Sequence, residues 1–410
     1  MESKNRVCIV GVTRFSLLLP GATQWNLSAQ TETLESYRER LYDPERLDAR
    51  LKIFTQLSLP QLAKGSRGSD YRHIVQHSSS LPSHYQVRLR ELSQQYDFLE
   101  IVCSDEKHVH DQSVSAAFRE IVPEQDRKYT SFAWFRLDDD DIVSDRYFDR
   151  IVPYVESESP GRVVSLGLGY SMIYSNGQLW DLRRDYRPKN SIGQLYICAF
   201  DESSDRLIEP PRGDHSIIDQ FAPTLLDSRQ PSFITVVHPM QDGRAHLDPD
   251  QALAAVEKEQ GNKPIVAVEG LEAEFSQVRE SDIVADFPLA PVMKEQSLSV
   301  EPIRESVGGN GDLVVEAQVT AAEVQTEGRV ILGTRFAPGT RPPATGRWVE
   351  VDRDTLAVGF VVNAPKMKFR AHLLGVPAAS ELVEMSVWVS RSFEGSVDLD
   401  DLQVGMRQKQ

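Results

Sequence analysis

The chain has 410 residues and a formal net charge of −16, from 45 lysines and arginines against 61 acidic residues. This length is typical of two or three domains, and a 40% share of hydrophobic residues is enough for ordinary cores. The acidic balance argues against a nucleic-acid partner, because phosphate binding relies on clustered positive charge. Three widely spaced cysteines indicate neither a disulfide framework nor a zinc knuckle.

No run approaches the roughly 18 apolar residues that a membrane helix needs, so we expect no transmembrane segment. The apolar run 7–12 is too short for a signal peptide. A reducing cytoplasm is the simplest setting for such a chain. We therefore expect a cytoplasmic protein, with peripheral attachment to the inner face of the membrane as the alternative.

Strand-like and helix-like segments alternate over about the first 240 residues, which favours an α/β architecture. Pro44 and Pro60 are expected to mark the start and the stop of the first long helix. Further strands, expected to run antiparallel beside a parallel half, are predicted at 162–173, 178–182, 195–200 and 232–237. The alternating elements themselves are strands at 6–12, 71–76, 98–103 and 132–137 and helices at 44–59, 82–95 and 112–122.

The texture of the chain changes after about residue 297. A helix is predicted at 248–260, followed by a stretch of mixed Pro, Gly and charges at 261–296. Short β-branched runs separated by Gly and Pro turns then predict an all-β sandwich of the jelly-roll kind. We expect a domain at 1–260, a linker at 261–296 and a β-sandwich accessory domain at 297–410.

Four consecutive aspartates, Asp138 to Asp141, follow the predicted strand 132–137 and precede a predicted helix at 144–155. Open α/β sheets bind ligands at the carboxyl ends of their strands. Clustered carboxylates repel one another unless a cation neutralises them, and Mg²⁺ or Mn²⁺ prefers such oxygen ligands. The alternatives are a solvated acidic turn, or a helix cap from Asp139 or Asp141.

Three segments resemble the bacterial rhamnosyltransferase family: Thr13-Arg-Phe-Ser-Leu-Leu, Tyr42-Asp-Pro-Glu-Arg-Leu-Asp-Ala-Arg-Leu-Lys-Ile-Phe54 and Arg136-Leu-Asp-Asp-Asp-Asp141. The resemblance covers about residues 6–245. That family is similar to the GT-A glycosyltransferases, which use nucleotide sugars and carry a metal-binding Asp-x-Asp. The resemblance implies a GT-A-like domain with a mixed central sheet. It also implies a metal-dependent hexosyltransferase that moves a sugar, rhamnose for example, from a nucleotide-diphosphate donor to a glycan or lipid-linked acceptor.

The resemblance assigns Asp138 and Asp140 to a Mn²⁺ or Mg²⁺ ion that stabilises the leaving diphosphate. His238, after a late strand, is the candidate third ligand, and His246 competes with it for this role. A lone histidine in such a place is more often simply hydrogen-bonded, and that alternative stays open.

Donor contacts are expected from Arg14, which can reach a diphosphate bidentately, and from Phe15, which either stacks on a base or packs in the core. Arg50 is preferred to Asp48 because residues two apart on a helix face different sides. The full donor set is Thr13, Arg14, Phe15, Arg50, Ser78, Asp138 and Asp139.

Asp214 matches the place where inverting GT-A enzymes carry the base that deprotonates the acceptor. The alternative is that it caps a helix at 216–221, with Asp219 as the fallback base. Trp180 is expected in the core or at an acceptor sugar. The sandwich is expected to bind polysaccharide or to mediate oligomerisation. A non-catalytic carbohydrate- or Ca²⁺-binding protein and a metal-dependent phosphohydrolase are the competing functions.

Overall fold

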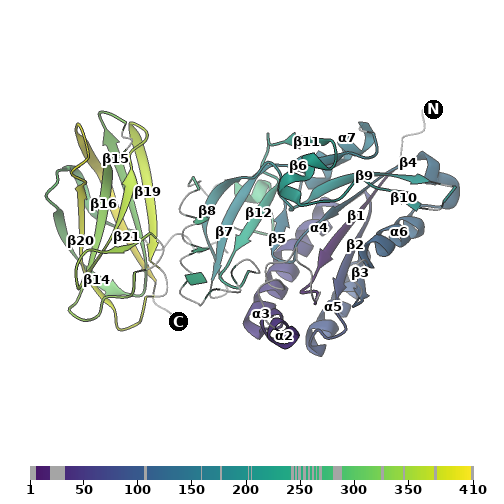
Figure 1. Cartoon of the computed structure of the whole chain (residues 1–410), viewed down its shortest axis with the longest axis horizontal. Helices are drawn as coiled ribbons and strands as arrows, with labels where there is room; N and C mark the ends of the chain where they lie inside the picture. The colour runs from purple at the N-terminus through teal and green to yellow at the C-terminus, as the bar shows by residue number, and fades with distance from the viewer. Residues whose placement is uncertain are drawn as a thin grey trace.

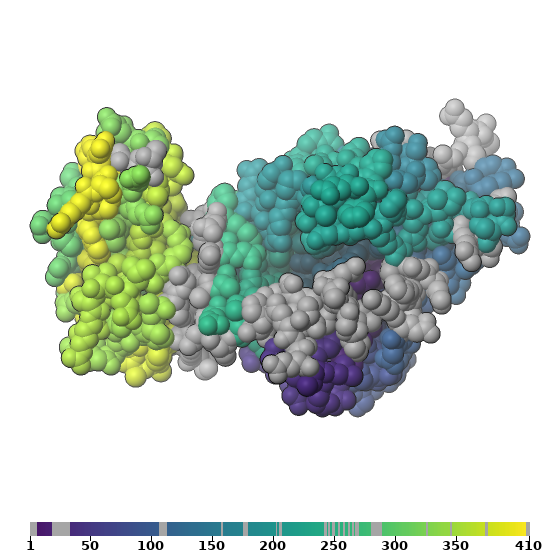
Figure 2. All heavy atoms as spheres, viewed as in Figure 1, coloured from purple at the N-terminus to yellow at the C-terminus, as the bar shows by residue number. Residues whose placement is uncertain are grey.

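The computed structural model describes residues 6–18, 33–105, 109–157, 159–175, 178–201, 203–204, 206–241, 244, 247, 251–252, 255–256, 259–260, 263–264, 266, 270–279, 289–324, 327–344, 347–373 and 376–407. The molecule is elongated, with a mixed α/β half at one end and an all-β half at the other (Figure 1; Figure 2). This arrangement confirms the predicted α/β character of the first half and the all-β character of the second.

The main sheet of the α/β half has the strand order β11-β6-β9-β4-β1-β2-β3. Its centre, β1 (Arg6–Arg14), pairs in parallel with β2 (Asp70–His77) and with β4 (Thr130–Arg136). β9 (Gln194–Asp201) runs antiparallel to β4, which makes the sheet mixed. The remaining strands are β3 (Leu99–Cys103), β6 (Val163–Leu166), β10 (Arg206–Ile208) and β11 (Thr224–Asp227).

Helices cover both faces of this sheet. Val10 and its neighbours at alternate positions of β1 pack with α6 (Val109–Ile121) on one face, and Ile9 packs with α7 (Tyr147–Ser157) on the other. Strands buried on both faces read as continuous apolar runs, which is why β1 was recognisable in the sequence. The other helices are α2 (Leu34–Leu41), α5 (Ser83–Gln95) and the 3-10 turns η2 (Glu124–Tyr129), η3 (His215–Gln220) and η5 (Leu271–Ala273).

The expectation that Pro60 ends the first long helix was wrong. The helix α3 (Pro44–Ile53) continues through a π-helical turn (Phe54–Ser58) into α4 (Leu59–Gly65). The backbone N–H of Leu59 bonds to the carbonyl of Phe54, five residues back. Pro60 then occupies the first turn of α4, where proline is tolerated because an N–H is not needed there.

A second sheet, in the order β5-β12-β7-β8, extends the α/β half. The single strand predicted at 162–173 is in fact two strands in different sheets, β6 and β7 (Leu168–Ser175), separated at Gly167. A Cβ at Gly167 would lie 2.7 Å from the Cα of Pro188, so the break needs a glycine. The other members are β5 (Asp141–Val143), β8 (Gln178–Tyr186) and β12 (Phe233–Val237).

The C-terminal β half consists of two antiparallel sheets, ordered β13-β21-β15-β19 and β14-β20-β16-β18-β17, around one shared apolar core. Trp348 belongs to this core and donates its indole N–H to the carbonyl of His372. The first strand begins at Ala290, inside the segment expected to be a linker. The strands are β13 (Ala290–Ser297), β14 (Ile303–Asn310), β15 (Asp312–Ala321), β16 (Arg329–Phe336), β17 (Val349–Glu350), β18 (Thr355–Val361), β19 (Lys366–Leu373), β20 (Glu381–Val389) and β21 (Val397–Arg407).

A buried ion cluster joins the two halves. Asp181 of β8, held at a positive φ of 57°, accepts hydrogen bonds from Arg183 (2.8 Å) and from Arg370 of β19 (3.3 Å). Arg370 also pairs with Glu316 of β15 at 2.5 Å. Trp180 packs edge-on against the ring of His372 across the same contact. Trp180 is therefore an interface residue rather than an acceptor-stacking one.

We expect Arg370→Ala to lower the free energy of unfolding by about 1–3 kcal/mol, because it removes one buried hydrogen-bond donor from Asp181, which keeps Arg183, and from Glu316, which keeps Lys368. The control Arg335→Ala removes an exposed pair with Glu384 in the same half and should cost less than about 1 kcal/mol. Urea denaturation followed by tryptophan fluorescence measures both. Equal, small losses for the two variants would contradict a stabilising role for the cluster.

Candidate active site

A cavity of about 830 Å³ opens at the carboxyl ends of β1 and β4. Its described lining is unusually rich in charge, with both signs interspersed. The arginines are Arg14, Arg46, Arg50, Arg136, Arg187 and Arg244, and the acids are Asp138, Asp139, Asp140, Asp141, Asp214 and Glu259. With these six of each sign, the formal charges of the lining cancel.

A chain of hydrogen bonds fixes the turn that carries the aspartates. The hydroxyl of Tyr71 lies 2.6 Å from Nδ1 of His73, and Nε2 of His73 lies 2.9 Å from the hydroxyl of Thr13. Thr13 in turn donates to the carbonyl of Leu137 at 2.8 Å. One proton arrangement satisfies every member, with Tyr71 donating to His73 and His73 donating to Thr13. The end of β4, and so the position of Asp138, is tied to β1 and β2.

Arg50, in the last turn of α3, lies between two of the aspartates. Its Nη1 binds the fully buried Asp139, and its Nη2 lies 3.1 Å from Oδ2 of Asp140. Nε2 of His238 lies 3.1 Å from the same oxygen of Asp140. Asp138 faces the other way and accepts two hydrogen bonds from Arg136, at 2.7 and 3.0 Å.

These contacts set opposite protonation tendencies for neighbouring acids. Burial alone would raise the pKa of Asp140, but the charge of Arg50 and the hydrogen bond from His238 outweigh it and hold that pKa below its usual value. Burial, together with the charges of Asp140 and Asp138, raises the pKa of Asp141 well above its usual value. Burial also lowers the pKa of His238, so its ring is neutral. The two neighbouring acids are thus shifted in opposite directions, with the carboxylate form favoured at Asp140 and disfavoured at Asp141.

The aspartates supply some, but not all, of the ligands that a divalent cation needs. Among the residues that the structure describes, no three His, Cys, Asp or Glu side chains form a ready metal cage. Mg²⁺ is usually held by one or two carboxylates with substrate phosphates and waters, so a cage is not required. Asp138 and Asp140 both open onto the cavity. Asp138 and Asp140 therefore fit a cation that would add positive charge beside a bound diphosphate.

Six of the residues predicted from the sequence line this one cavity: Arg14, Arg50, Asp138, Asp139, Asp140 and Asp214. Asp48 accepts a hydrogen bond from Tyr85 (2.7 Å) instead, so it and Arg50 point apart, as their spacing predicts. His246 lies outside the described residues.

The remaining donor-contact predictions are not supported by where the side chains lie. Thr13 is buried against His73 and Leu137, and Phe15 is buried in the core beside Phe54, 6.4 Å between ring centroids. Ser78 is buried and accepts a hydrogen bond from the backbone of Leu18. These three side chains support the backbone around the cavity rather than facing into it.

Asp214 does cap η3, accepting hydrogen bonds from the backbone N–H and the hydroxyl of Ser216. These bonds lower the pKa of Asp214, which keeps the carboxylate ionised. It remains exposed at the cavity, so capping does not remove it from solvent or ligand. Asp219 pairs with Lys189 at 2.7 Å. Asp139 and Asp141 do not cap the next helix, because β5 intervenes and α7 begins only at Tyr147.

Two cavity arginines, Arg46 and Arg244, escaped the sequence analysis. Arg46 lies four residues before Arg50 and so on the same side of α3, a signal that was available. The basic cluster Arg183, Arg184, Arg187 and Lys189 is readable in the sequence as a contact for an anionic substrate or as a solvated loop. Its members separate: Arg187 lines the cavity, whereas Arg183 lies in the ion cluster between the halves and Lys189 binds Asp219. Arg244 follows an irregular stretch and pairs with Glu259, and no local pattern indicates it.

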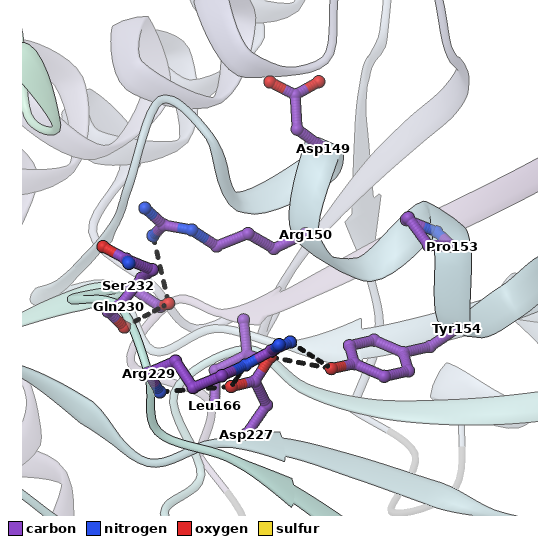
Figure 3. Close-up of a pocket in the computed structure, with 9 residues that line it drawn as sticks. All are labelled: Asp149, Arg150, Pro153, Tyr154, Leu166, Asp227, Arg229, Gln230 and Ser232. Carbon is purple, nitrogen blue, oxygen red and sulfur yellow. Dashed lines mark hydrogen bonds and ion pairs between the residues drawn. The ribbon is translucent and has the colours of Figure 1, made fainter.

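A second, smaller cavity of about 450 Å³ lies between α7 and the loop after β11 (Figure 3). Asp227 accepts a hydrogen bond from Tyr154 (2.7 Å) and two from Arg229. Arg150 points toward Ser232 on the opposite side. None of the predicted site residues lines this cavity.

The fold and the cavity define an α/β protein with a densely charged site at the carboxyl ends of parallel strands. The model of the family described as "Putative rhamnosyl transferase" matches residues 8–247. The chain belongs to this family.

Two solved structures are similar at a distance. The crystal structure of S. aureus TarS 1–349 is 10% identical with a TM-score of 0.28, and the match covers 62% of this chain and 64% of that one. A carbohydrate binding module from Cellvibrio mixtus lichenase 5A, in complex with cellotriose, is 8% identical with a TM-score of 0.16, covering 29% and 90%. Both are too remote to bear on function. No curated protein matches the chain. Within the described residues, no helix has the length and apolar character to span a bilayer.

The buried His73 makes stability depend on pH. Burial lowers the pKa of His73 from 6.5 to about 3. As pH falls below 6.5 the unfolded chain takes up this proton first, so stability is full above 6.5 and falls by up to about 1.4 kcal/mol per pH unit down to about pH 3. We expect His73→Gln to be less stable at pH 7 but to have a flatter profile. An unchanged slope in urea melts from pH 7 to 4 would contradict this, and exposed His84→Gln is the control.

Proposed function

We propose that the cavity transfers a sugar, rhamnose in the first instance, from a nucleoside diphosphate to a hydroxyl of a glycan or lipid-linked acceptor. The carrying observation is that Asp138, Asp140 and a set of arginines share one cavity at the carboxyl ends of parallel strands. Open α/β sheets bind nucleotides at this edge. We further propose that the α/β half, residues 1–260, has a GT-A-like arrangement.

The donor diphosphate would lie against the arginines of the cavity. A guanidinium can bind two phosphate oxygens at once, and Arg14 and Arg46 both line the wall beside the aspartates. Arg244 also lines the cavity and pairs with Glu259. Fixed charges of this kind stabilise the negative charge of the leaving diphosphate, because they are already oriented before the reaction begins.

Asp138 and Asp140 are the residues that would hold Mn²⁺ or Mg²⁺ at the diphosphate. When bound, the cation supplies Lewis-acid stabilisation of the leaving group. His238 was expected as a ligand, but its Nε2 is engaged with Asp140 and its ring is buried. We assign His238 the task of orienting Asp140, as residues behind metal ligands commonly do.

Asp214 is the proposed base. It is ionised and exposed at the cavity, so its carboxylate can take the proton of the attacking acceptor hydroxyl. A base on the acceptor side, opposite the departing diphosphate, corresponds to direct displacement with inversion of the anomeric centre. The proposed setting is the cytoplasm, and the C-terminal β half, which begins at Ala290 rather than at the expected residue 297, is available for glycan binding or oligomerisation.

Asp138→Asn and Asp140→Asn should each reduce sugar transfer by about 10²-fold or more, because the electrostatic stabilisation of the leaving group is lost. Release of nucleoside diphosphate from a panel of nucleotide sugars with Mn²⁺ measures this, and circular dichroism checks the fold. Asp126→Asn, an exposed acid outside the cavity, is the control. Full activity in both cavity variants would refute the assignment.

Asp214→Asn separates the two roles of this residue. Asparagine also caps helices, so the melting temperature should hardly change. Loss of the base should lower kcat by about 10²- to 10⁴-fold and remove the acidic limb of the pH–rate profile. Asp219→Asn, on the same 3-10 turn but bound to Lys189, should retain activity. A wild-type kcat in Asp214→Asn would rule out Asp214 as the base.

A further inference from the structure

Arg50 occupies the position of a counter-ion within the aspartate turn. Its side chain is 7% exposed, and it bridges Asp139, which is 0% exposed, and Asp140, which is 7% exposed. Nη1 of Arg50 contacts Asp139, and Nη2 contacts Asp140. The guanidinium of Arg50 and the two carboxylates together carry a formal net charge of −1.

A divalent cation on Asp140 changes this balance. It brings two positive charges to an oxygen that already lies 3.1 Å from Nη2 of Arg50 and 3.1 Å from Nε2 of His238. At such separations in a partly buried site, like charges repel strongly. Arg50 and the cation therefore compete for Asp140.

The contact with Asp139 allows Arg50 to release Asp140 while it stays in the site. Asp139 lies deeper than Asp140 and can hold Nη1 while the other arm of the guanidinium turns into the cavity, which Arg50 already lines. A diphosphate there presents oxygens that suit the freed arm. The guanidinium of Arg50, displaced from Asp140 by the cation, thus binds the negatively charged diphosphate of the donor.

We propose that Arg50 is an exchangeable counter-ion, which neutralises Asp140 in the free protein and moves to the donor diphosphate when the cation binds. This rests on the proposed function, and it makes Arg50 both a competitor of the cation and a ligand of the donor. Cation and nucleoside diphosphate then bind cooperatively, because each removes the obstacle to the other.

The test is Mn²⁺ binding to the full chain by calorimetry, with and without a nucleoside diphosphate, in wild type, Arg50→Ala and Arg50→Lys. Removal of the competing charge should tighten Mn²⁺ alone by about tenfold or more in Arg50→Ala. The same variant should lose most of the cooperativity between Mn²⁺ and the diphosphate. Arg50→Lys keeps the charge and should stay near the wild-type affinity for Mn²⁺.

Thermal melts give a readout independent of turnover. Arg50→Ala leaves two buried carboxylates uncompensated, so it should melt below wild type, and Mn²⁺ should raise its melting temperature more than that of wild type. Arg150→Ala is the matched control, because this part-buried arginine pairs with Glu274 at 2.7 Å and does not line the cavity of the aspartates. Its affinity for Mn²⁺ should remain that of wild type.

Mn²⁺ binding that is unchanged or weaker in Arg50→Ala would overturn the exchange. If the wild type still binds Mn²⁺ in that case, the metal's proposed role in transfer stands. If no variant bound Mn²⁺, even with diphosphate, the exchange and the metal's role would both fall. Transfer measured in EDTA then decides separately whether the proposed glycosyl transfer stands.

Discussion

The bridge from Arg50 to Asp139 and Asp140 is the contact on which the candidate site depends. Adjacent carboxylates taken out of water repel each other, and burying them is unfavourable unless a cation lies between them. Arg50 comes from α3, whereas the aspartates follow β4, so the contact also fastens a helix to the end of the central sheet. Without it the two buried carboxylates would lose their fixed counter-charge, and the turn would be less stable.

Other buried residues around the cavity support the side chains that face it. The side chains of Thr13 and His73 contribute nothing that a ligand can touch, yet they fix the strand end from which Asp138 projects. His238 orients Asp140 from behind. The charges that face the cavity are balanced by one another before any ligand arrives, and a ligand acts by redistributing these ion pairs.

Much of this could be predicted from the sequence, because buried parallel strands have a strong local signature and the aspartates follow one of them. The ends of elements were harder: the π turn before Pro60 keeps a helix going where proline normally stops it. The side-chain directions at the end of β1 were available but unused. Strand residues alternate in direction, so Thr13 and Phe15 face one way and Arg14 the other, and only Arg14 meets the cavity. The pairing of Arg50 with Asp139 spans 89 positions and has no local signal.

The ion cluster of Asp181 and Arg370 has a mechanical consequence. A module on a free tether samples many orientations, but the C-terminal β half can swing only by pulling an arginine away from buried carboxylates. While the ion cluster is intact, a ligand bound to the C-terminal β sheets lies at a defined distance from the aspartates.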